Sequence, residues 1–260
     1  VLSSPTLLTT DNEAAEMRVG ENIPFQGGVT GLPFGGGGTS GAAPGGGFSF
    51  PFQSIQRKDL ELKLKLLKQV AGENPKQPWV YTNTSSIPIS ELDAKAGLGG
   101  RIMGFHFYNP PAVQKLVELI LGQATRPELA EFARALAKEL RKTVVPSRDK
   151  AGFIGNGHFM RDMLHGMDEV QRLGRELPFV QAVYCVNRVS QDFLVRPMGI
   201  FQLVDYVGLD VCQCILKVMD PRLPDHNLKS ALLERLLSLG VKGGQNHDGS
   251  QKDGFLRYEK

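Results

Sequence analysis

His106 and Glu118 are the residues of this sequence best placed to move a proton. His106 follows the apolar run 102–105, and Glu118 stands in the middle of the apolar segment 116–120. A glutamate in an apolar strand is costly to bury unless something pairs with it, and the turn between the two runs allows them to lie side by side. A carboxylate beside a histidine orients the ring and stabilises the imidazolium, so the pair is typical of a general base. A buried histidine that merely satisfies its hydrogen bonds is the alternative.

A group of small polar residues, Asn83-Thr84-Ser85-Ser86, follows the apolar run 79–81. Ligands of open α/β folds bind at the carboxyl ends of parallel strands, so this group is well placed to hold a substrate. The alternative is that these residues form an ordinary turn with a helix N-cap, which has the same composition.

The segment 150–157 contains Gly152, Gly155 and Gly157 and joins the strand-rich part of the chain to a helical part. Its glycines permit close backbone approach, and Asn156 would then project into the seam between two domains, a common place for a substrate. A plain linker would have a similar composition.

Apolar periodicity predicts the elements that must position these residues. Short runs predict strands at 79–81, 102–105, 116–120 and 143–145, and residues 127–142 carry apolar side chains at the spacing of one helix face. Helices are predicted at 160–173, 180–193, 201–219 and 228–239, the last closed by Gly240. We therefore predict a remnant of a Rossmann-type parallel sheet followed by an all-α C-terminal domain.

Residues 59–68 alternate leucine with charged residues, as a strand would, yet they also place leucines on one helix face and form a Glu61–Lys65 pair four residues apart. No β-branched residue precedes Val70, so we favour a helix.

Residues 1–58 have a different composition. β-formers around a turn at Asp11-Asn12 predict a hairpin-like pair of strands, and the glycine-rich stretch 26–47 predicts a disordered loop. The loop contains a GxGxxG pattern at residues 36–41, but proline and glycine on both sides forbid the strand and helix that a dinucleotide turn requires.

Composition excludes several classes of function. The net charge of +3 is spread along the chain, which gives no reason to expect nucleic acid as a partner. The three cysteines form no CxxC pair, so we expect buried thiols and no metal site. No apolar run approaches the ~20 residues of a spanning helix, so residues 59–260 predict no membrane partner.

Four motifs together resemble the 3-hydroxyacyl-CoA dehydrogenase family from about residue 59 to the end. They are Asn-Thr-Ser-Ser, His-Phe-Tyr-Asn-Pro-Pro with Lys-Leu-Val-Glu, Gly-Phe-Ile-x-Asn, and the segment 197–210. By this resemblance His106 is the general base on the substrate 3-hydroxyl and Glu118 is its partner. Ser85 and Asn109 bind the reacting oxygen, Asn156 helps to close the site, and Asn83 lies near the nicotinamide.

The resemblance implies oxidation of a 3-hydroxyacyl-CoA to a 3-oxoacyl-CoA with NAD, as in fatty-acid β-oxidation, in a cytoplasmic protein that dimerises through its helical domain. The family begins with a strand, a GxGxxG turn and an acidic residue for the ribose, and we do not find these in the sequence. We therefore expect a partial Rossmann-type domain at 59–148, a helical domain at 149–260, and a chimeric or truncated, inactive chain that does not bind NAD.

Residues 1–58 resemble the pore-forming domain of type II secretion secretins, which are outer-membrane channels. The similarity lies in 1–14, 19–25 and 54–59, in that order around the glycine-rich loop. A secretin fragment is accordingly the alternative function for the chain, although a barrel would need many further strands where the sequence predicts helices.

Overall fold

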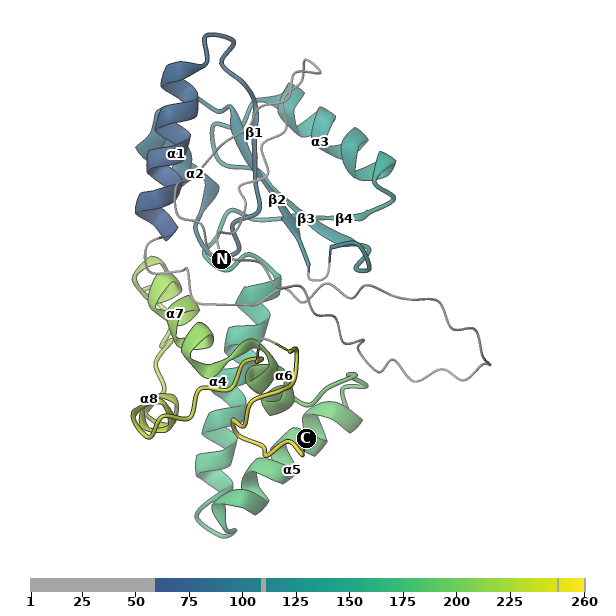
Figure 1. Ribbon diagram of the computed structural model, residues 1–260, viewed down its shortest axis with the longest axis vertical. Coiled ribbons are helices and arrows are strands. Elements are labelled where there is room, and N and C mark those ends of the chain that lie inside the picture. The colour runs from purple at the N-terminus through teal and green to yellow at the C-terminus, as the bar shows by residue number, and fades with distance from the viewer. Residues whose placement is uncertain (1–58, 109–110, 247, 260) are drawn as a thin grey trace, which may run out of the picture.

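The computed structural model describes residues 59–108, 111–246 and 248–259. The predicted N-terminal hairpin, the glycine-rich loop and the GxGxxG pattern lie outside these residues. The described chain forms a region of sheet and helices followed by a region of helices, one above the other in Figure 1.

A four-stranded sheet with the order β1-β2-β3-β4 forms the centre of the first region. Its strands are β1 (Val80–Thr82), β2 (Ile102–Phe107), β3 (Leu116–Ile120) and β4 (Thr143–Ser147). β1 pairs with β2 and β3 with β4 in parallel, but β2 and β3 are antiparallel. The expectation of a purely parallel sheet is therefore wrong at one pairing. The connection 108–115 is too short for the crossover of a dozen or more residues that parallel neighbours need.

Helices cover both faces of the sheet, with α1 and α2 on one side and α3 on the other (Figure 1). They are α1 (Asp59–Glu73), α2 (Ile89–Ala96) and α3 (Pro127–Glu139). Side chains alternate along the strands, so Ile102 packs with α1 and α2 whereas Met103 packs with α3. The helix favoured for 59–68 is confirmed, and its partly buried Leu60, Leu64 and Leu67 pack against this side of the sheet.

The short helix α2 is not predicted from the sequence, because its N-cap is Pro88, whose side chain makes no capping hydrogen bond. Its first amides are instead bonded by a distant side chain: Asp149 accepts from Ile89 N at 2.5 Å and from Ser90 N at 2.8 Å. The capping residue comes from the loop after β4, so local sequence gives no sign of it.

The second region consists of α4 (Gly155–Leu173), α5 (Phe179–Asp192), α6 (Ile200–Val207), α7 (Leu209–Met219) and α8 (Ala231–Ser238), with a short 3-10 turn at Asp220–Arg222. The single helix predicted over 201–219 is wrong, because Gly208 has φ +103° and breaks it into α6 and α7. The predicted end of the last helix at Gly240 agrees with its φ of +82°.

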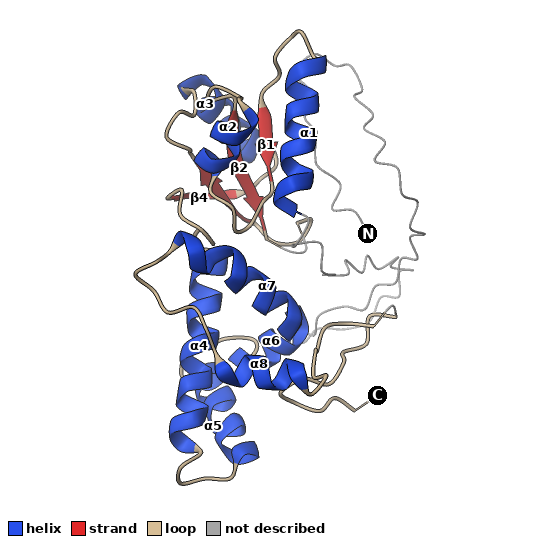
Figure 2. Ribbon diagram, turned by 90° about the vertical axis from the view of Figure 1, so that its left-hand side faces the viewer, coloured by secondary structure: helices blue, strands red, loops and turns tan. Residues whose placement is uncertain are grey.

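The two regions meet along a seam below the sheet (Figure 2). The Arg222 guanidinium donates two hydrogen bonds to the Glu91 carboxylate of α2, from Nε to Oε2 at 2.6 Å and from Nη2 to Oε1 at 2.8 Å. Gly152 passes so close to α7 that a Cβ there would lie 2.6 Å from Met219 Cε. The seam therefore combines a bidentate ion pair with a close backbone approach.

Cys212 is buried, while Cys185 and Cys214 are half-buried, and all three are free thiols. Within the described ranges no helix has the length and apolar character needed to span a membrane.

Candidate active site

His106 and Glu118 lie opposite one another on the antiparallel strands β2 and β3. The antiparallel register of the two strands sets His106 directly opposite Glu118. Their proximity, predicted from the sequence, is therefore present in the structure. The imidazole Nδ1 lies 3.4 Å from Glu118 Oε1.

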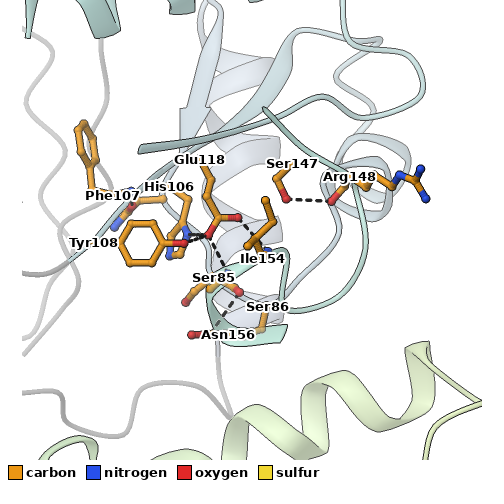
Figure 3. A network of polar contacts seen from close by, with 12 residues as sticks. Ser85, Ser86, His106, Phe107, Tyr108, Glu118, Ser147, Arg148, Ile154 and Asn156 are labelled. Carbon is orange, nitrogen blue, oxygen red and sulfur yellow. Dashed lines mark hydrogen bonds and ion pairs between the residues drawn. The ribbon is translucent and has the colours of Figure 1, made fainter. Parts of the chain in front are cut away.

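The Glu118 carboxylate is completely buried and is held at the N-terminus of α4 (Figure 3). The amides of Ile154 and Gly155 donate to Oε2 and Oε1, each at 3.0 Å. The Tyr108 hydroxyl donates a further hydrogen bond to Oε1. The first amides of a helix are a favourable place for a negative charge. The N-terminus of α4 therefore stabilises the ionised Glu118 carboxylate.

These contacts keep Glu118 ionised despite its burial. Burial by itself raises the pKa of Glu118, but His106, the Tyr108 hydroxyl and the two amides outweigh it and lower the pKa to about 2. The site therefore presents a fixed negative charge to the histidine ring at every pH at which the protein would work.

His106 is 7% exposed, and its Nδ1 makes no hydrogen bond in this geometry. The contact with Glu118 is therefore electrostatic. The ring packs against Tyr108 and Phe153, with centroid distances of 5.4 and 5.9 Å. Since Nδ1 faces Glu118, Nε2 on the other side of the ring is the atom available for a substrate.

Phe153 adopts a left-handed backbone conformation with φ +47°. Such a conformation is strained for a bulky residue and persists only where the surroundings enforce it. Here it places the ring beside His106 and leads the chain directly into α4. The glycine-rich segment 150–157 is therefore more than a linker, because it carries the amides that hold Glu118.

Asn156 reaches from α4 to the loop after β1 (Figure 3). Its Nδ2 donates to the Ser85 carbonyl at 3.3 Å and to Ser86 Oγ at 3.2 Å. The structure thus places Ser85 and Asn156 next to each other at the seam, on the side of the sheet where His106 and Glu118 lie. Asn109 is outside the described residues.

Asn83 is exposed at the carboxyl end of β1, where its Oδ1 accepts from Phe107 N at 2.8 Å. This hydrogen bond holds Asn83 beside the end of the strand that carries His106. The amides that open α2 and α4 already hold Asp149 and Glu118, so these two helix N-termini do not fit a pyrophosphate.

Sequence reasoning missed Tyr108. One signal was present, because residues two apart on an extended segment point to the same face, and Tyr108 stands two residues after His106. Nothing in the sequence indicates that the Ile154 and Gly155 amides reach Glu118, since they are more than thirty residues away along the chain.

Two family models match the chain. The model described as "3-hydroxyacyl-CoA dehydrogenase, NAD binding domain" matches residues 57–150, and the one described as "3-hydroxyacyl-CoA dehydrogenase, C-terminal domain" matches residues 181–253. The expectation that the NAD-binding half is missing is therefore wrong for residues 57–150, which match that domain. The matches support neither a secretin fragment at residues 1–58 nor a chimera.

Curated relatives agree with the family models. The "Probable 3-hydroxybutyryl-CoA dehydrogenase" of Bacillus subtilis (strain 168) is 32% identical over 214 residues, which cover 78% of this chain and 67% of the relative. The protein of the same name from Deinococcus radiodurans is 30% identical over 193 residues, which cover 74% of this chain and 67% of the relative.

Solved structures share the fold. FadB2 of M. tuberculosis has a TM-score of 0.67 at 28% identity, covering 78% of this chain and 68% of the other. The (S)-3-hydroxybutyryl-CoA dehydrogenase PaaH1 of Ralstonia eutropha has a TM-score of 0.66 at 28% identity, covering 77% of this chain and 67% of the other. The sheet with its helical region is therefore a Rossmann-like dehydrogenase fold with a helical C-terminal region.

Proposed function

Since this chain belongs to the 3-hydroxyacyl-CoA dehydrogenase family, we propose that it oxidises the 3-hydroxyl group of a 3-hydroxyacyl-CoA, with His106 as the general base. NAD is the cofactor of the family. When bound, it accepts the hydride that leaves C3 of the substrate.

The observation that carries the proposal is the buried pair formed by His106 of β2 and Glu118 of β3. His106 Nε2 takes the hydroxyl proton, and the ring becomes an imidazolium. Glu118 stabilises that cation because its charge is fixed 3.4 Å away and its pKa lies near 2. A base placed in this way contributes roughly 10²–10⁴ in rate.

We assign supporting roles to the polar residues at the seam. Ser85 and Asn109 bind the reacting oxygen, Asn156 closes the site through its link to the Ser85 loop, and Asn83 contacts the nicotinamide. The link between Asn156 and Ser85 supports this division of roles, because it ties the helical region to the substrate loop.

The wider assignments are also proposals. We place the domain boundary at 148/149, between the end of β4 and the start of α4, and the protein in the cytoplasm. We further propose a homodimer formed through the helical region. Exposed apolar side chains on α5 and just after it support the dimer, since Val180 is 76% and Phe193 is 81% exposed. We do not propose a channel function, because the matched residues form a dehydrogenase fold.

The test follows NADH at 340 nm with (S)-3-hydroxybutyryl-CoA and NAD. Two proteins are assayed: the chain alone, and the chain joined ahead of Asp59 to the part of the Bacillus subtilis relative that the match leaves uncovered. Inactivity of the chain alone stays a prediction. The joined protein is therefore included, so that the role of His106 can be tested even if the chain alone does not bind the dinucleotide. We expect His106→Gln to lower kcat by about 10²–10⁴, and Glu118→Gln to lower it as well while circular dichroism stays unchanged.

Lys95→Gln is the matched control, since the Lys95 side chain is half exposed and its partner Glu91 keeps both hydrogen bonds to Arg222. It should leave the rate within about twofold of the parent, because an ion pair with a half-exposed lysine contributes little. Equal rates for the parent and His106→Gln would refute the catalytic assignment, and so would a joined protein that forms no NADH.

A further inference from the structure

The Tyr108 hydroxyl donates a hydrogen bond to Glu118 Oε1, the same carboxylate oxygen that His106 Nδ1 faces. We propose that Tyr108 is a positioning residue that competes with His106 for Glu118 Oε1 and thereby limits how strongly the carboxylate supports the base. This inference rests on the proposed function for its kinetic consequence, but the competition itself is a property of the free protein.

Glu118 Oε1 has its hydrogen-bonding capacity filled without the histidine. A carboxylate oxygen offers two lone-pair sites. The Tyr108 hydroxyl and the Gly155 amide, the latter at 3.0 Å, take both. His106 Nδ1, at 3.4 Å from the same oxygen, is a buried polar atom without a hydrogen-bond partner. A buried donor left without a partner is costly, so the arrangement needs something that holds it in place.

Packing against α4 holds Tyr108 in this position. A Cβ at Gly155 would lie 2.6 Å from the Tyr108 hydroxyl oxygen and 2.8 Å from Cε1, so the ring rests directly on the glycine backbone. Burial raises the pKa of Tyr108 well above its usual range, and the Glu118 charge raises it further. The phenol therefore remains a proton donor to the carboxylate.

Removal of the hydroxyl frees one lone-pair site on Oε1 and leaves His106 Nδ1 as the nearest donor. The two atoms should then approach to about 2.8 Å, the length of a charge-assisted hydrogen bond. Tyr108 and Glu118 are the titratable side chains that contact His106 in the described residues, while α4 contributes the Ile154 and Gly155 amides and the Phe153 ring is neutral. A better bonded carboxylate favours the charged form of the ring.

The experiment compares the parent protein with Tyr108→Phe and Tyr81→Phe. Tyr81 is the matched control, because it is a buried tyrosine of β1 whose hydroxyl donates at 3.1 Å to the Leu129 carbonyl and not to Glu118. Proton NMR of ¹⁵N-histidine-labelled protein without substrate should show a His106 Nδ1 proton at lower field, and slower in exchange with water, in Tyr108→Phe alone. In the joined protein, the acid limb of the kcat/KM profile should move to higher pH.

Gly155→Ala provides a second variant in case Tyr108→Phe folds poorly. Its new methyl group displaces the phenol while the tyrosine and the amide that donates to Glu118 both remain, so it should produce the same NMR change. Unchanged His106 resonances in both folded variants would overturn the proposal, as would the same change in Tyr81→Phe. The NMR result stands even if His106→Gln proves fully active, so a failure of the proposed function and a failure of this inference are distinguishable.

Discussion

Asp205 should make the protein more stable as the pH falls from neutral toward 5. Its carboxyl group is fully buried on α6 and accepts hydrogen bonds from Phe255 N at 2.7 Å, Leu256 N at 2.9 Å and the Tyr258 hydroxyl at 3.1 Å. Burial nevertheless dominates and raises the pKa of Asp205 to about 6. The C-terminal segment is thus attached to the helical region through a carboxylate that is costly to keep charged.

The direction and size of the effect come from proton linkage. The pKa is about 6 in the folded protein and 3.8 for the unperturbed group, so the folded state binds the proton more tightly. The resulting stabilisation is fully present below pH 3.8 and is lost as the pH rises through 6. The difference of about two units, at about 1.36 kcal/mol for each, gives about 3 kcal/mol in total. Between pH 7.5 and 5 the gain is about 1.4 kcal/mol.

The assay is urea denaturation followed by circular dichroism at 222 nm, at pH 5, 6, 7 and 7.5. Asp205→Asn cannot titrate at this position, so the free energy of unfolding of the parent minus that of the variant isolates Asp205. Glu118 and Glu91 have pKa values near 2 and do not titrate in this range. Fluorescence of Trp79, in the sheet region, tests whether the two regions unfold together. A difference between parent and variant that stays constant across these pH values would refute the reasoning.

Two further predictions concern contacts between elements and between subunits. A double-mutant cycle of Arg222→Gln and Glu91→Gln should give a coupling energy of about 1–2 kcal/mol, because the bidentate pair is four-fifths buried. Urea denaturation of the four proteins measures this coupling energy. A value below about 0.3 kcal/mol would contradict the prediction. Val180→Glu with Phe193→Glu should convert the proposed dimer to a monomer in analytical ultracentrifugation. Val113→Glu, a control at an exposed apolar residue of the sheet region, should leave the dimer intact. A parent protein that sediments as a monomer would exclude the dimer.

Local sequence was sufficient to predict most of the elements and the central pair of the site. Short apolar runs indicated the strands, and apolar residues at the spacing of one helix face indicated most of the helices, because both patterns reflect which side chains are buried. Glu118 in an apolar strand indicated a partner, and His106 was the nearest candidate. The helix at 201–219 was overextended, since a glycine within an apolar pattern does not reveal the φ it will adopt.

Tertiary structure alone decided how the site is completed. The amides of Ile154 and Gly155 come to Glu118 only because α4 begins directly below β3, and Asp149 caps α2 only because β4 ends next to it. Tyr108 reaches the same carboxylate because the chain turns at the end of β2 and packs on Gly155. These contacts join residues far apart in the chain or depend on the packing of neighbouring elements, and residue spacing in the sequence does not encode either.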